Sequence, residues 1–173
     1  MARVQRWRDP SRSSPSRRAA AAPPVAQPFL KWVGGKAQLL VQFTRFFPEQ
    51  VDRYIEPFIG GGAVFFHLKR RFPHLRAVLR DNNDELINTY RVVRDAPEAL
   101  MQRLDEHLTR YHEDCRGYYY RVRKMELTAA DGVERAARMI FLNKTCFNGL
   151  WRVNLRGRFN APIGTQPRQS LYD

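Results

Sequence analysis

The sequence feature that most constrains the fold is a glycine-rich corner at residues 54–66. An apolar run ends in the carboxylate of Glu56, Pro57 blocks further regular pairing, and three consecutive glycines precede an apolar helical pattern. This order predicts a strand, a glycine loop and a helix. Glycines tolerate positive φ and have no Cβ, so the backbone of such a loop can lie against a bound ligand. A tight strand-to-helix turn without a ligand is the alternative interpretation of this stretch.

The spacing of the glycines and of a later carboxylate narrows the class of ligand. Gly60-x-Gly62 begins like the dinucleotide-binding fingerprint, but Phe65 occupies the position of its third glycine, which disfavours NAD and FAD. A second predicted strand at 76–80 ends in Asp81, where a carboxylate can accept the hydroxyl groups of a ribose. These features predict an adenosine-type ligand without a pyrophosphate, such as S-adenosylmethionine. The alternative role for Asp81 is to cap the helical pattern that follows it.

A second glycine pair lies near the start of the ordered pattern, within residues 28–36. A Gly-Gly-Lys sequence precedes a helical apolar face at 39–47, but the P-loop spacing and its hydroxyl residue are absent, which disfavours ATP. The ring of Trp32 and the ammonium group of Lys36 could instead hold a sulfonium and a carboxylate. The alternative is a structured turn with Trp32 in the core.

The composition is strongly basic. The formal charge is +13, from 30 lysines and arginines against 17 acidic residues. Residues 1–27 carry six arginines and one aspartate, so a charge of +8 remains for the rest of the chain. Such an excess predicts a polyanionic partner, with nucleic acid first, although a solvated arginine-rich surface would give the same balance. The composition of 1–27 predicts a disordered basic tail, which we interpret as an inert extension rather than a DNA-binding arm.

The composition also indicates the cellular compartment and whether a metal site is expected. No apolar run is long enough to cross a membrane, and the N-terminus lacks the apolar core of a secretory signal. Cys115 and Cys146 have no metal-type spacing, so we expect free thiols in a reducing, cytoplasmic setting and no metal site. His107 and His112 are interpreted as solvent-facing residues of a helix.

The second half of the chain predicts four helices followed by a hairpin. The helical patterns cover 84–94, 97–112, 117–128 and 131–143. Apolar residues then alternate with arginines and asparagines from Trp151 to Leu155, and a glycine turn precedes Phe159, which predicts a β-hairpin. The basic and amide groups suit base edges and phosphates, with a solvated hairpin face as the alternative.

Four segments of the sequence occur in an order that characterises one enzyme family. They are residues 29–36 (Phe-Leu-Lys-Trp-Val-Gly-Gly-Lys), residues 54–66, Asp81-Asn82-Asn83 and residues 143–164. Together they closely resemble the Dam-type, class D12 family of DNA adenine-N6 methyltransferases over about residues 28–170. The resemblance implies an α/β, Rossmann-like S-adenosylmethionine-dependent methyltransferase fold. Here we expect an incomplete sheet and a helical and β-hairpin DNA-recognition region.

The resemblance also implies a division of the chain and a set of binding residues. We divide the chain into a disordered basic tail at 1–27, a cofactor-binding part at 28–94 and a DNA-recognition region at 95–173. The implied contacts to S-adenosylmethionine are Trp32, Lys36, Glu56, Phe58, Gly60, Gly62 and Asp81. The implied contacts to double-stranded DNA are Lys31, Phe147, Asn148, Leu150, Arg152 and Pro162.

One part of the family's pattern does not occur among the 173 residues. In the family, a catalytic Asp-Pro-Pro-Tyr follows the recognition region and grips the amino group of a flipped adenine, but this chain has no such motif. We therefore assign no catalytic residue and expect this chain alone to be inactive. A second polypeptide is one source of the missing segment. The alternatives are a non-catalytic DNA-binding remnant and an RNA or small-molecule methyltransferase.

Overall fold

The computed structural model describes residues 26–165 and 170–172. The tail predicted at 1–27 lies outside the described residues except for its last two. Within the described ranges the chain combines helices with a small two-stranded parallel sheet. None of the helices there combines the length and the hydrophobicity that a membrane-spanning helix needs.

The sheet confirms the predicted order of strand, glycine loop, helix and strand. Strands β1 (Arg53–Glu56) and β2 (Arg76–Leu79) run parallel, with Glu56 opposite Leu79 at the carboxyl end of the sheet. Helix α2 (Ala63–Arg71) forms the crossover between them, because parallel neighbours cannot be joined by a tight turn. Its apolar side chains pack on one face of the sheet and bury Val64 and Leu68.

The segment before the sheet forms short helical turns instead of the single helical face predicted at 39–47. These turns are η1 (Lys36–Leu39), α1 (Leu40–Phe43) and η2 (Thr44–Phe46), and none of their residues is buried. The hydroxyl of Thr44 donates to the carbonyl of Leu40, and the backbone becomes extended at Phe47, the residue before a proline.

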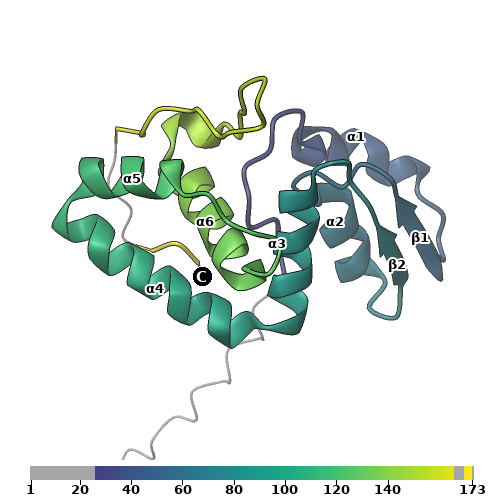
Figure 1. The fold of residues 1–173 in the computed structure, drawn as a ribbon. Coiled ribbons are helices and arrows are strands. Elements are labelled where there is room, and N and C mark those ends of the chain that lie inside the picture. The colour runs from purple at the N-terminus through teal and green to yellow at the C-terminus, as the bar shows by residue number, and fades with distance from the viewer. Residues whose placement is uncertain (1–25, 166–169, 173) are drawn as a thin grey trace, which may run out of the picture.

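Four longer helices follow the sheet close to the predicted ranges. They are α3 (Asp84–Asp95), α4 (Pro97–Glu113), α5 (Cys115–Lys124) and α6 (Gly132–Thr145). Figure 1 shows α3 between the sheet and the group formed by α4, α5 and α6. Helix α6 lies at the centre of the core, since eight of its residues are buried. The helix predicted at 117–128 ends earlier, at Lys124, because the backbone of Met125 is no longer helical (φ −57°, ψ 132°). In the turn before α6, Asp131 accepts hydrogen bonds from the backbone and hydroxyl of Thr128.

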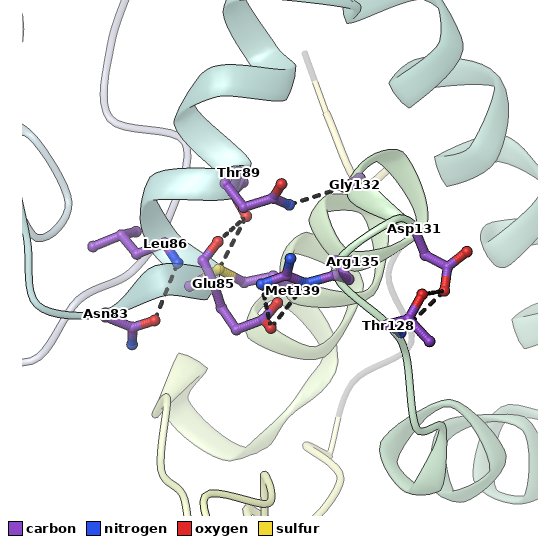
Figure 2. Close-up of polar contacts among 10 residues, drawn as sticks. Asn83, Glu85, Leu86, Thr89, Thr128, Asp131, Gly132, Arg135 and Met139 are labelled. Carbon is purple, nitrogen blue, oxygen red and sulfur yellow. Dashed lines mark hydrogen bonds and ion pairs between the residues drawn. The ribbon is translucent and has the colours of Figure 1, made fainter.

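Polar contacts fix α3 against α6 (Figure 2). The guanidinium of Arg135 donates to Glu85 Oε1 at 3.1 and 2.9 Å, and the Thr89 hydroxyl lies 3.1 Å from the sulfur of Met139. Helix α3 begins directly after the loop that carries Asp81. The α3–α6 contact therefore ties the segments beyond α6 to the carboxyl end of the sheet.

The interpretation of His107 as a solvent-facing residue was wrong. Its side chain is only 2% exposed, because its ring stacks on Phe141 of α6 and its Nδ1 lies 2.8 Å from the hydroxyl of Tyr118 on α5. The partners come from two other helices, so the pattern along α4 does not reveal them.

The predicted hairpin is present but narrow. A single antiparallel bridge joins Val153 to Phe159, and the side-chain oxygen of Asn154 accepts from the backbone of Arg156 and Arg158 at 2.9 and 3.0 Å. This side-chain turn closes the loop early, so a long ladder of paired residues does not develop. A second bridge, between Cys146 and Ile163, holds the base of the loop against the end of α6.

Candidate functional site

A cavity of about 260 Å³ opens at the carboxyl end of the two strands. In open α/β sheets this end is where ligands bind, because the loops that follow the strands meet there. All seven residues expected to contact the cofactor line this cavity: Trp32, Lys36, Glu56, Phe58, Gly60, Gly62 and Asp81. The structure thus brings together residues that lie up to 49 positions apart in sequence, from Trp32 to Asp81.

Glu56, the last residue of β1, is a buried carboxylate with one unused oxygen. The ammonium group of Lys36 lies 3.5 Å from Glu56 Oε1 and donates to the carbonyl of Phe58 at 3.3 Å. Glu56 Oε2 is buried and has no hydrogen-bond partner among the described residues. A buried acceptor left in this state costs free energy, so this oxygen is suited to receive a hydrogen bond from a ligand.

Asp81 joins the two loops of the cavity. Its Oδ2 accepts from the backbone N–H of Gly60 at 3.0 Å, and its Oδ1 accepts from the backbone N–H of Asn83 at 3.1 Å. The cap of α3 is instead Asn83, whose side-chain oxygen accepts from the backbone of Leu86 (Figure 2). The alternative interpretation of Asp81 as the cap is therefore wrong, and its carboxylate remains at the cavity wall.

The glycine loop needs a residue without a Cβ at position 60. Gly60 has a φ of +51°, and a Cβ there would lie 2.7 Å from Cδ1 of Trp32. The indole of Trp32 is half-buried against this loop, while Phe58 is 68% exposed at the rim. One wall of the cavity is therefore formed by close contact between two segments, residues 30–36 and residues 58–62.

The six residues expected to contact DNA are brought to one layer beyond α6. The backbone of Phe147 donates to the carbonyl of Pro162 at 2.9 Å, and Lys31 packs against Gly149. Five of the six are exposed, and Leu150 is half-buried. Residues 147–149 form a tight turn, η3, in which Asn148 has a positive φ of 54° and is exposed. The layer adjoins the cavity through the segment around Lys31.

Residues 32–171 match the family of D12 class N6 adenine-specific DNA methyltransferases. The match covers most of the chain and includes both the cavity and the layer beyond α6. The chain belongs to this family.

Named relatives agree with this membership of the D12 class. The type II methyltransferase M.MjaIII of Methanocaldococcus jannaschii is 40% identical over 159 residues, which cover 85% of this chain and 55% of the relative. The type II methyltransferase M1.LlaDCHI of Lactococcus lactis subsp. cremoris is 40% identical over 151 residues, covering 85% and 51%. The DNA adenine methylase of Escherichia coli K12 is 37% identical over 149 residues, covering 83% and 51%. This D12 class chain spans about half the length of these relatives.

Two hydrogen bonds hold the side chain of Arg152 within the hairpin. Its Nε donates to the side-chain oxygen of Asn160 at 2.7 Å, and its Nη2 lies 3.3 Å from the carbonyl of the same residue. Arg158 pairs with Glu126 at 2.5 Å. The guanidinium of Arg152 is thus oriented by an amide, and it has five N–H donors in total, so donors remain for a ligand.

Tyr90 supports the glycine loop of the candidate site, a role that sequence reasoning missed. Its hydroxyl donates to the carbonyl of Gly60 at 3.1 Å. Burial raises its pKa, and the nearby carboxylates of Glu56 and Asp81 raise it further, so the hydroxyl remains a neutral donor. The signal that could have found it is the helical spacing from Leu86, which places Tyr90 on the inner face of the helix that follows Asp81.

Proposed function

We propose that this D12 class chain contributes the methyl-donor site and part of the DNA surface of a site-specific DNA adenine-N6 methyltransferase. The observation that carries the proposal is the convergence of all seven expected cofactor residues on one cavity. In this proposal residues 28–94 hold the cofactor within a Rossmann-like unit, and residues 95–173 recognise double-stranded DNA. The relatives named as DNA adenine methylases support the choice of adenine.

S-adenosylmethionine fits the charges around the cavity. The side chains there include two carboxylates, Glu56 and Asp81, and one ammonium group, Lys36. The ligand itself carries a sulfonium and an ammonium group against a single carboxylate, so its net charge complements that of the wall. The unused Oε2 of Glu56 and the carboxylate of Asp81 are acceptors for the ligand's hydroxyl and ammonium donors. Lys36 is the partner for its carboxylate.

Membership of the D12 class implies the reaction in which such a site would take part. When bound, S-adenosylmethionine would supply a methyl group on a positively charged sulfur for transfer to the N6 amine of a flipped adenine; the nitrogen would lose a proton and the S–C electron pair would stay on sulfur. The residues described here bind and orient the donor and hold the duplex. The Asp-Pro-Pro-Tyr that grips the amine in the family is not among these 173 residues, so we propose that it must be supplied for transfer to occur.

A methyl-transfer assay tests the proposal. Residues 1–173 are incubated with labelled S-adenosylmethionine and duplex DNA, alone and with a second polypeptide that carries the family's Asp-Pro-Pro-Tyr segment. We expect label on adenine N6 only in the mixture, because proximity and orientation of both reactants supply about 7–11 kcal/mol of barrier reduction. Transfer by residues 1–173 alone would contradict the need for that segment. Cofactor binding with label on RNA or a small molecule, and none on DNA, would reject DNA as the substrate.

Two hairpin arginines are predicted to act differently on DNA. If Arg152 reads a base edge, Arg152→Ala should relax the preference among duplex sequences by about 1–3 kcal/mol, which is the value of a bidentate contact to a base. Arg156→Ala should weaken binding to all duplexes alike and reduce the slope of log affinity against log salt by about one, as expected for a phosphate contact. Arg156 is the better phosphate candidate for this test, because Arg158 already pairs with Glu126.

The measurement is the affinity for a selected and a scrambled duplex at two salt concentrations. Each variant serves as the control for the other, since both remove one positive charge from the same hairpin. Equal losses on the two duplexes for Arg152→Ala would show that this side chain reads no base.

A further inference from the structure

A single buried amide joins the cofactor-binding segment to the DNA-facing layer. Asn143 lies near the carboxyl end of α6 and is 1% exposed. Its Oδ1 accepts from the backbone N–H of Lys31 at 3.0 Å, and its Nδ2 donates to the carbonyl of Lys31 at 2.8 Å. The same Nδ2 donates to the carbonyl of Gly149 at 3.0 Å. One side chain therefore holds the backbones of two segments that are more than a hundred residues apart.

The segment that Asn143 holds lies between the two candidate surfaces. On one side, Trp32 packs so closely on the glycine loop that a Cβ at Gly60 would lie 2.7 Å from its ring. On the other side, Lys31 packs on the turn η3, where a Cβ at Gly149 would lie 2.7 and 2.8 Å from the Lys31 side chain. In Figure 1 this segment passes beside the loop that follows α6. Residues 30–32 therefore contact both the cavity wall and the DNA-facing turn.

These contacts leave little freedom for one surface to move without the other. The amide of Asn143 makes three of its four possible hydrogen bonds, because its oxygen accepts one and its nitrogen donates two. Breaking any of them would leave a buried donor or acceptor unsatisfied. A movement of Lys31 on binding DNA must therefore carry Trp32 with it or break a buried hydrogen bond.

We propose that Asn143 is a positioning residue that couples occupancy of the methyl-donor cavity to recognition of DNA. The proposal rests on the proposed function, because it assigns the two sites that are coupled. Coupling of this kind is reciprocal: the factor by which the cofactor raises affinity for DNA equals the factor by which DNA raises affinity for the cofactor. Asn143 touches neither ligand and acts through Lys31 and Gly149.

The test measures this factor in the 173-residue chain. The ligands are S-adenosylhomocysteine, which lacks the methyl group and so cannot react, and the duplex that the unchanged chain selects from a randomised pool. Duplex affinity is measured with and without saturating S-adenosylhomocysteine, and the reverse titration is also made. We expect the unchanged chain to show a coupling factor of about five-fold or more in both directions.

Two variants break the bridge from opposite sides. Asn143→Asp keeps the acceptor for the Lys31 N–H but places an oxygen against the carbonyls of Lys31 and Gly149. Gly149→Ala leaves Asn143 intact and drives a Cβ into the Lys31 side chain at a position with a φ of +67°. In both variants the coupling factor should fall toward one. The affinity for S-adenosylhomocysteine alone and the melting temperature report separately on loss of structure.

Thr89→Val is the matched control. Thr89 is as fully buried as Asn143, and its hydroxyl bonds to the Glu85 carbonyl and to Met139 on the same helix α6, whereas the amide of Asn143 bonds to Lys31 and Gly149. We expect it to lower stability and preserve coupling. Coupling that survives in Asn143→Asp and Gly149→Ala, or that disappears equally in Thr89→Val, would overturn the proposal. An unchanged chain that binds neither ligand would instead reject the proposed function.

Discussion

Replacing Asp81 by alanine is expected to weaken binding of S-adenosylmethionine by about 1–3 kcal/mol, or roughly five- to 150-fold. In the proposed function this carboxylate accepts the ribose hydroxyl groups, and in the structure it holds the backbone N–H of Gly60 at the cavity wall. Both losses act in the same direction, because the ligand's donors lose an acceptor and the glycine loop loses its anchor. Isothermal titration calorimetry on the unchanged chain and the variant measures the effect.

Asn83→Ala is the control for this prediction. It removes the cap of α3, which typically costs about 1 kcal/mol of stability, but Asn83 does not line the cavity. We expect reduced stability and unchanged cofactor affinity. A cofactor analogue without ribose hydroxyl groups separates the two contributions of Asp81. If the carboxylate contacts the ribose directly, Asp81→Ala should change the affinity for this analogue less than it changes the affinity for S-adenosylmethionine. Unchanged affinity for S-adenosylmethionine in Asp81→Ala would contradict both contributions of this carboxylate to cofactor binding.

The parts of the site that could be predicted from sequence depend on local signals. The apolar run before Glu56, the three glycines and the helical pattern after them each restrict the backbone where they stand. The carboxyl ends of two parallel strands must meet at one edge, so Asp81 was expected beside the glycine loop once both strands were recognised. The family resemblance then contributed Trp32 and Lys36, whose local pattern left a structured turn as an alternative.

The parts that could not be predicted depend on contacts between distant segments. Asn143 bonds to Lys31 across 112 positions, and no periodicity relates the two. His107 lies on a helix whose polar residues outnumber its apolar ones, yet it is buried because Phe141 and Tyr118 approach from α6 and α5. The alternation from Trp151 to Leu155 predicted a hairpin but not how narrow its pairing is, since the side chain of Asn154 accepts backbone hydrogen bonds within the turn.

Acidification is expected to destabilise the helical part of the chain through His107. Burial lowers the pKa of His107 to about 4, and the positive charges of Arg103 and Arg110 on the same helix add to this effect against the opposing charge of Glu106. The other titratable groups at the ring are Tyr118 on α5 and Glu134 on α6, whose Oε1 lies 3.3 Å from Nε2. The folded chain therefore holds this ring neutral at a pH where an unfolded chain would protonate it.

The direction of the pH dependence follows from which state binds more protons. Between an unfolded pKa of about 6.5 and the folded value, the unfolded chain binds the extra proton, so the free energy of unfolding falls as the pH is lowered through this window. The loss is about 3 kcal/mol when complete near pH 4 and is restored above about pH 6.5. Urea denaturation of the 173-residue chain across this window measures it.

His107→Gln isolates this contribution from that of the acidic residues, which also titrate at low pH. Glutamine does not titrate but can still hydrogen bond to Tyr118, so the difference in unfolding free energy between variant and unchanged chain should shift by about 3 kcal/mol across the window. His112→Gln, at an exposed position on the same helix, is the control for loss of a histidine that is not buried. Parallel pH curves for His107→Gln and the unchanged chain would mean that the folded protein protonates His107 as readily as the unfolded one does. In that case the carboxylate of Glu134, which lies 3.3 Å from Nε2, would stabilise the protonated ring enough to offset its burial.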